Sequence, residues 1–88
     1  MIRRRVAVHG EVQGVFFRDS CQAEAQAAGV AGWVRNTSAG TVEAVFEGPA
    51  DSVEQLVGWC RTGSDQARVD QVDVEHEEPR GDTAFVVR

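Results

Sequence analysis

The sequence has 88 residues, with nine basic and fourteen acidic side chains and a formal net charge of −5. This length fits a single domain over residues 1–88, and the hydrophobic content of 42% is typical of a globular protein. All nine basic residues are Arg, which excludes mechanisms that need a Lys, and the acidic balance disfavours binding to nucleic acid.

The first part of the chain predicts a strand followed by a helix. Residues 4–12 alternate, with Val6 and Val8 on one face and Arg5 on the other, as expected for a half-buried strand. A glycine-containing loop follows, and a helical pattern extends over residues 18–28 with Phe17, Cys21, Ala25 and Ala28 on one stripe. Gly29 is placed to end this helix in a left-handed conformation.

The middle of the chain predicts a hairpin and a second helix. Residues 32–37 and 41–47 form two strands joined by a turn at residues 38–40. A helix then begins at residues 48–49, where Pro is tolerated, and Gly63 ends it. Its apolar stripe consists of Val53, Leu56, Val57 and Cys60.

The last part predicts a fourth strand over residues 67–74, an acidic loop over 75–82 and a short strand over 83–87. The order is therefore β-α-β-β-α-β with a final extra strand. It predicts an α+β fold of the ferredoxin-like split β-α-β type, in which two helices cover one face of a four- to five-stranded antiparallel or mixed sheet. This architecture hosts many functions, so the site must decide the function.

Residues 10–18, Gly-Glu-Val-Gln-Gly-Val-Phe-Phe-Arg, are the first segment that indicates chemistry. A strand leads through a glycine loop into a helix, and backbone N–H groups in such a loop form an anion-binding site. Arg18 begins the helix, where a positive charge is unfavourable unless an anion is bound nearby. Arg also suits the bidentate recognition of phosphate. A turn glycine and a solvated Arg explain the same spacing without a ligand.

The second segment, residues 32–36, reads Gly-Trp-Val-Arg-Asn. Asn36 ends the strand on the same face as Val34, and its amide group can hold a water molecule by donating and accepting hydrogen bonds. By itself, Asn36 is better explained as a residue that starts a turn.

Together, these two segments resemble the signature motifs of the acylphosphatase family. The resemblance continues through residues 40–43 and 47–49, Trp59 and Phe85, and so covers almost the whole chain. One departure lies at residues 63–67, where many members have a glycine-proline turn. We expect this segment to lie away from both motifs and so to affect loop stability rather than chemistry.

The resemblance implies an enzyme that hydrolyses the carboxyl-phosphate bond of acyl phosphates without a metal or cofactor. It implies that Arg18 binds the phosphate, that Asn36 positions the attacking water, and that the amides of Gly14, Val15, Phe16, Phe17 and Arg18 surround the phosphate. Inorganic phosphate is then both product and competitive inhibitor. Asp19 is interpreted as a capping or surface residue, because a carboxylate beside an anion site repels the substrate. Nothing in the motifs recognises the acyl group, so we expect broad tolerance there.

The predicted fold is also compatible with three other functions. A regulatory module of the same fold would bind phosphate or another small anion without turnover. A carbamoyl-phosphate-handling domain of a larger protein is a related possibility, although a chain that begins at Met1 favours a free-standing protein. An RNA-binding sheet needs paired aromatic residues and a basic surface, which this chain lacks.

The remaining expectations concern location, assembly and the cysteines. No apolar run is long enough to span a membrane, and Val6-Ala7-Val8 is too short for a secretory signal. We therefore expect a cytoplasmic monomer that does not bind membranes. Cys21 and Cys60 form no Cys-x-x-Cys pair and predict neither a disulfide framework nor a zinc site, so they are interpreted as buried packing residues.

Overall fold

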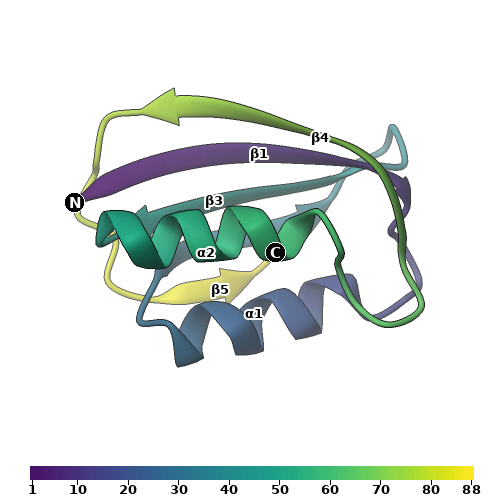
Figure 1. Ribbon diagram of the computed structural model, residues 1–88, viewed down its shortest axis with the longest axis horizontal. Helices are drawn as coiled ribbons and strands as arrows, with labels where there is room; N and C mark the ends of the chain where they lie inside the picture. Colours follow the sequence, from purple (N-terminus) through teal and green to yellow (C-terminus); the bar gives the residue numbers. More distant parts are fainter.

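The computed structural model describes all 88 residues and contains five strands and two helices (Figure 1). In chain order they are β1 (Ile2–Glu11), α1 (Phe17–Ala27), β2 (Ala31–Asn36), β3 (Val42–Gly48), α2 (Ala50–Cys60), β4 (Arg68–Glu77) and β5 (Phe85–Val87). This order confirms the predicted split β-α-β arrangement, and β5 is the predicted extra strand. Neither helix is long and apolar enough to cross a membrane.

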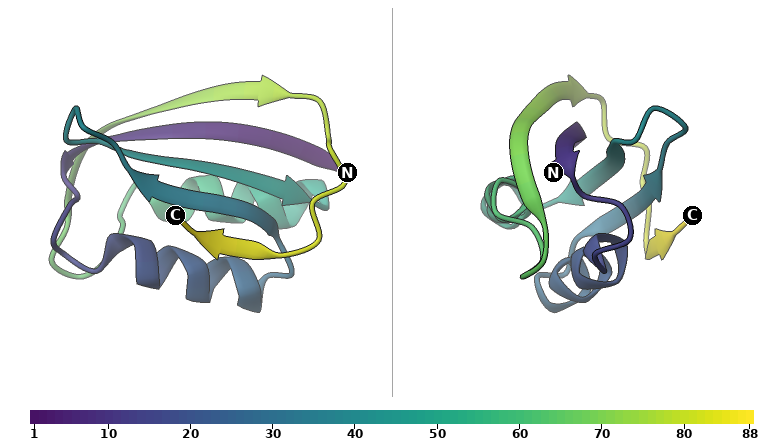
Figure 2. Two further views of the ribbon diagram at one scale, coloured as in Figure 1. Left: turned by 180° about the vertical axis from the view of Figure 1, so that it is seen from behind. Right: turned by 90° about the vertical axis from the view of Figure 1, so that its right-hand side faces the viewer.

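All five strands belong to one mixed sheet with the order β4-β1-β3-β2-β5. The pairs β1–β3, β1–β4 and β2–β3 are antiparallel, whereas β5 runs parallel to β2. Both helices pack on one face of the sheet, and no helix covers the other face (Figure 2). The hairpin between β2 and β3 lies at the same end of the sheet as the loop that leads from β1 into α1 (Figures 1 and 2).

The core lies between the helices and the covered face of the sheet. The apolar stripes predicted for the helices are confirmed, except that Ala28 lies just beyond α1 and is half-buried. The fully buried stripe residues are Phe17, Cys21 and Ala25 in α1 and Val53, Leu56, Val57 and Cys60 in α2. Cys21 and Cys60 are buried free thiols, as predicted. The neighbouring Cys60 and burial both raise the pKa of Cys21, which keeps this thiol protonated and unreactive.

Strand β4 is longer than predicted, because residues 75–77 belong to it rather than to an acidic loop. Glu77 pairs in register with Arg3, and its two carboxylate oxygens accept hydrogen bonds from Arg3 Nε at 2.9 Å and Arg5 Nε at 2.6 Å. These cross-strand charge pairs compensate for the low strand propensity of Glu. The final strand, Phe85–Val87, is shorter than the predicted strand over residues 83–87.

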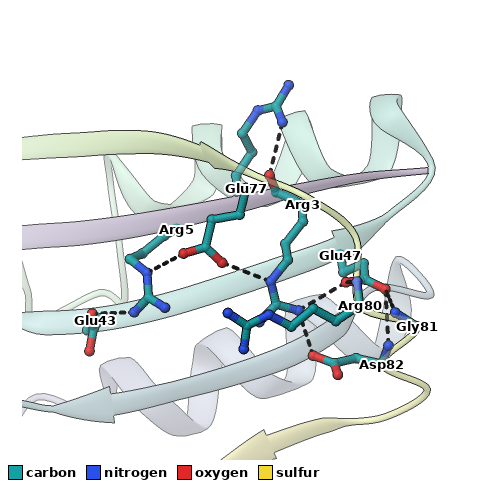
Figure 3. Close-up of polar contacts among 9 residues, drawn as sticks. Arg3, Arg5, Glu43, Glu47, Glu77, Arg80, Gly81 and Asp82 are labelled. Carbon is teal, nitrogen blue, oxygen red and sulfur yellow. Dashed lines mark hydrogen bonds and ion pairs between the residues drawn. The ribbon is translucent and has the colours of Figure 1, made fainter.

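Glu47 connects the segment before β5 to the sheet (Figure 3). Its side chain is 1% exposed and accepts hydrogen bonds from the backbone N–H groups of Arg80, Gly81 and Asp82 at 2.8, 2.7 and 3.0 Å. Arg3, whose side chain is 2% exposed, forms an ion pair with Glu47 at 3.0 Å. The carboxylate therefore fixes the turn that returns the chain to β2, where β5 adds in parallel.

Candidate active site

The loop between β1 and α1 has the backbone conformation expected of an anion-binding loop. Gly14 has φ +73°, and Phe16, immediately before α1, has φ 62° and ψ 24°. A left-handed conformation costs a residue with a Cβ roughly 1–2 kcal/mol. A bulky residue held there is strained, and such strain is concentrated at functional sites.

The amide groups of this loop are available to a ligand. Residues 14–19 donate no backbone hydrogen bond to any acceptor in the protein, and the first N–H of the helix with a partner is that of Ser20, bonded to Phe16 O at 3.1 Å. No side chain caps α1. The helix therefore presents free N–H groups and the positive end of its dipole to the loop, which is the arrangement that binds phosphate groups.

Two side chains outside the helix hold the loop in place. Gln13 Nε2 donates to the carbonyl oxygens of Thr37 at 2.8 Å and Thr41 at 2.9 Å, which ties the loop to the β2–β3 hairpin. Ser64 Oγ donates to Val15 O at 2.6 Å. The expectation that residues 63–67 lie away from both motifs is therefore wrong, because Ser64 contacts the first motif directly.

A pocket of about 260 Å³ brings the two motifs together. Its lining residues are Val12, Gly14, Phe16, Phe17, Arg18, Asp19 and Asn36. Arg18 and Asn36 both line this pocket, together with three of the four loop residues named from the family resemblance. Val15 does not line this pocket; its carbonyl is bonded to Ser64.

The polar side chains of the pocket are largely unpaired within the protein. Arg18 is half-buried, and its Nη1 donates a single 3.3 Å hydrogen bond to the carbonyl oxygen of Arg88. Asn36 Oδ1 is buried and has no hydrogen-bond partner. A buried amide oxygen without a partner costs about 1–3 kcal/mol, so this site favours a donor such as water.

Asp19 lies in the first turn of α1, lines the pocket and is exposed. Its interpretation as a surface residue is confirmed, whereas the capping role is wrong, because α1 has no side-chain cap. No group of three or more His, Cys, Asp or Glu side chains lies close enough together to hold a metal ion.

Trp33 and Arg35, which belong to the same motif as Asn36, project from the opposite face of the sheet. The guanidinium groups of Arg5, Arg35 and Arg88 lie 5.5, 5.8 and 4.6 Å from the centre of the Trp33 ring. Arg35 also forms an ion pair with Glu43 at 2.6 Å. Because side chains alternate along β2, Trp33 and Arg35 form contacts on the uncovered face of the sheet, whereas Asn36 lines the pocket.

Sequence reasoning missed Gln13 and Ser64. Gln13 lies inside the first motif, and this position could have marked it as functional. Its hydrogen-bond partners could not be predicted, because they lie in a hairpin more than twenty residues away. Ser64 carried no signal in the sequence, because its contact depends on how the α2–β4 connection folds back against the loop.

The fold and the pocket define a ferredoxin-like α+β protein with a loop of unpaired backbone amides at a helix N-terminus. Comparison with known proteins identifies the family. The acylphosphatase family model matches residues 4–87. A curated acylphosphatase from Natronomonas pharaonis is 49% identical over 87 residues, covering 99% of this chain and 95% of the relative. One from Rubrobacter xylanophilus is 57% identical over 79 residues, covering 90% and 72%.

Comparison with solved structures identifies the same family. The crystal structure of acylphosphatase from Bacillus subtilis superimposes with a TM-score of 0.96 at 35% identity, covering 100% of this chain and 99% of that one. The chain belongs to the acylphosphatase family. It is a hydrolase of acyl phosphates, and the alternative of a non-catalytic anion-binding module is not favoured.

Proposed function

We propose that the pocket between the loop and β2 is the catalytic site, with Arg18 and the loop amides binding the phosphate and Asn36 positioning the attacking water. The observation that carries this proposal is the presence, in one pocket, of free helix N-terminal amides, a half-buried Arg and an unpaired buried amide oxygen.

Phosphate binding uses two kinds of donor. The N–H groups of residues 14–18 surround the phosphate oxygens, and the guanidinium of Arg18 pairs with two of them, a geometry that Lys does not provide. The 3.3 Å contact between Arg18 and the Arg88 carbonyl is long and uses one nitrogen, so most donors of the guanidinium stay available. Together these donors stabilise the negative charge of the transition state.

Asn36 holds the water. Its Oδ1 accepts a hydrogen bond from the water, which leaves an oxygen lone pair directed at phosphorus. The water oxygen forms a bond to phosphorus while the bond from phosphorus to the acyl oxygen breaks. The carboxylate leaves with that electron pair.

The proton of the water passes to a phosphate oxygen. A carboxylate is a good leaving group, so positioning and charge stabilisation are enough without a strong general base. Arg18 and Asp19 are the only titratable side chains that line the pocket, and Asp19 is exposed to solvent. We therefore propose a reaction in which positioning and charge stabilisation act without a metal ion or a cofactor.

The test is hydrolysis of benzoyl phosphate by the wild type and by Arg18→Ala, with EDTA present and inorganic phosphate as competitor. Turnover survives EDTA, is inhibited competitively by phosphate, and falls by about 10²–10³ in Arg18→Ala, as when a key transition-state donor is removed. Arg61→Ala is the control, because Arg61 is exposed and forms no ion pair while carrying the same charge. A folded Arg18→Ala with near-native turnover contradicts the assignment.

Asn36→Ala separates water positioning from substrate binding. It lowers kcat far more than it changes KM, because the water matters only after substrate is bound. Asp19→Asn tests the absence of a general base and retains turnover at neutral pH. A change in KM alone for Asn36→Ala, or loss of turnover in Asp19→Asn, would reassign these residues.

The proposal extends to the assembly and location of the protein. All the groups named above come from one chain, so a monomer is sufficient for activity, and the chain acts in the cytoplasm on small acyl phosphates rather than on nucleic acids or membranes. Sedimentation of the active protein and fractionation of cells that express it test these two points.

A further inference from the structure

A second pocket, of about 330 Å³, adjoins the proposed phosphate site. Phe16 lines both pockets, and the residue is 69% exposed. The far side of the second pocket is formed by the first turns of α1, by Trp59 of α2 and by the connection at residues 63–66. Phe16, the strained residue of the loop, thus lies at the boundary between the two pockets.

The second pocket combines an apolar surface with negative charge. Val15, Phe16 and Trp59 supply its hydrophobic wall. The only charged side chains that line it are Glu24 and Asp65, and neither forms an ion pair or a side-chain hydrogen bond with the rest of the protein. No Arg lines it. Its potential is therefore negative, in contrast to the phosphate pocket with its free amides and Arg18.

We infer that the second pocket receives the acyl group of the substrate and selects flat, uncharged acyl groups over those that carry a carboxylate. This inference rests on the proposed function of the first pocket. The acyl group is joined to phosphorus through one oxygen, so it leaves the phosphate site within a few ångströms, and Phe16 is the residue shared by the two pockets. An aromatic acyl group packs against Phe16 and Trp59, whereas a carboxylated one faces Glu24 and Asp65.

The walls of this pocket are fixed relative to the phosphate loop. Ser64 Oγ holds the Val15 carbonyl at 2.6 Å, and the Phe17 ring packs on Trp59 with a centroid separation of 5.1 Å. A displacement of the connection at residues 63–66 therefore moves the loop as well. This coupling makes the acyl pocket a rigid extension of the phosphate site, which is what discrimination between acyl groups requires.

The experiment compares kcat/KM for benzoyl phosphate and succinyl phosphate in the wild type and in the double variant Glu24→Gln/Asp65→Asn. Leaving-group reactivity differs between the two substrates but cancels when their ratio is compared between variants. One unit charge at roughly 6 Å in water-like surroundings changes a rate constant by about threefold. The benzoyl-to-succinyl ratio is therefore expected to fall by about tenfold in the double variant, and further in Asp65→Arg.

The control is Glu75→Gln/Glu78→Gln, which removes the same two charges from exposed residues that do not line the pocket. Its ratio stays at the wild-type value. An unchanged ratio in Glu24→Gln/Asp65→Asn and in Asp65→Arg, with benzoyl phosphate still hydrolysed normally, overturns the inference while leaving the proposed function intact. If the wild type hydrolyses neither substrate, the proposed function itself fails.

Discussion

Ser64 Oγ donates a 2.6 Å hydrogen bond to the carbonyl oxygen of Val15, so a residue after α2 holds the loop that precedes α1. Gln13 makes the corresponding connection to the β2–β3 hairpin through Thr37 and Thr41. The N–H groups of residues 14–19 donate no backbone hydrogen bond within the protein, so the loop has few backbone contacts of its own. Its shape therefore depends on these two side chains.

Ser64→Ala removes one of the two connections and loosens the loop. We expect the free energy of unfolding to fall by about 1 kcal/mol, the typical net contribution of one hydrogen bond. We expect kcat/KM for benzoyl phosphate to fall by about five- to tenfold, since small errors in positioning are costly. Urea unfolding and steady-state kinetics measure the two effects. Ser52→Ala removes a hydroxyl of α2 that makes no hydrogen bond, so it should leave kcat/KM unchanged and should not lower the free energy of unfolding.

Phe16 tests whether strain is stored in the loop. Phe16→Gly and Phe16→Ala both remove the ring, but only Ala keeps a Cβ at φ 62°. The Gly variant should therefore be more stable than the Ala variant by about 1 kcal/mol, despite the greater flexibility of Gly in the unfolded state. Equal stability by thermal or urea unfolding would show that the left-handed conformation is not strained. Both variants should lose activity toward benzoyl phosphate, because the ring is missing in both.

The predictable part of this protein is the part encoded by local patterns. Alternation in β1 and the apolar stripes of the two helices indicated the layers and the order of elements. The position of Asn36 at the end of β2, on the same face as Val34, followed from the two-residue repeat of a strand. The position of Arg18 followed from the helix start. Their meeting in one pocket was implied by the family resemblance rather than by either pattern.

The parts that could not be predicted depend on partners distant in the sequence. Residues 75–77 have the composition of an acidic loop, and they form a strand because Arg3 and Arg5 lie opposite them on β1. Glu47 alternates like an exposed residue of β3, yet it is buried, since three backbone N–H groups of the turn before β5 converge on it. Local propensity contains no information about such pairings.

Glu47 should make the protein sensitive to acid. Burial works to raise the pKa of Glu47, but the Arg80 N–H, the Arg3 guanidinium and the N–H groups of Gly81 and Asp82 outweigh it and hold the pKa below its ordinary value of 4.5. A carboxylate whose pKa is lowered by folding stabilises the folded state fully above its unfolded pKa, and this stability is lost as pH falls below about 4.5. The pKa of Glu77 is lowered too, through Arg5 and Arg3, and adds to the effect.

Glu47→Gln isolates the contribution of this carboxylate. We expect it to lower the free energy of unfolding at pH 7 by about 3 kcal/mol, because it leaves the buried Arg3 short of one partner. The decline in stability between pH 5 and pH 3 should become shallower than in the wild type. Urea unfolding across this pH range measures both quantities. The control is Glu78→Gln, which makes the same substitution at an exposed glutamate. An equally steep decline in Glu47→Gln would assign the acid sensitivity to other carboxylates.

Gly63 packs directly against Phe17, at the end of the loop between β1 and α1, and leaves no room for a side chain. Its φ is +73°, and a Cβ placed on it would lie 2.7 Å from Cε2 and 3.0 Å from Cδ2 of the Phe17 ring. Phe17 is the first residue of α1, buried against Trp59, so its ring cannot move without shifting the helix start. We expect Gly63→Ala to lower the free energy of unfolding by about 2–3 kcal/mol, from a disfavoured φ and an overpacked core.

The matched control is Gly58→Ala in α2. A Cβ on Gly58 meets nothing within 4 Å, and the residue lies in the interior of a helix, so Ala should stabilise the protein by about 0.5–1 kcal/mol. The two variants add the same methyl group and should shift the unfolding transition in opposite directions. Only Gly63→Ala should also lower kcat/KM, because the displaced Phe17 ring moves the amides that precede Arg18. A destabilised Gly63→Ala with wild-type kinetics would mean that the connection after α2 supports the core and leaves the phosphate loop undisturbed.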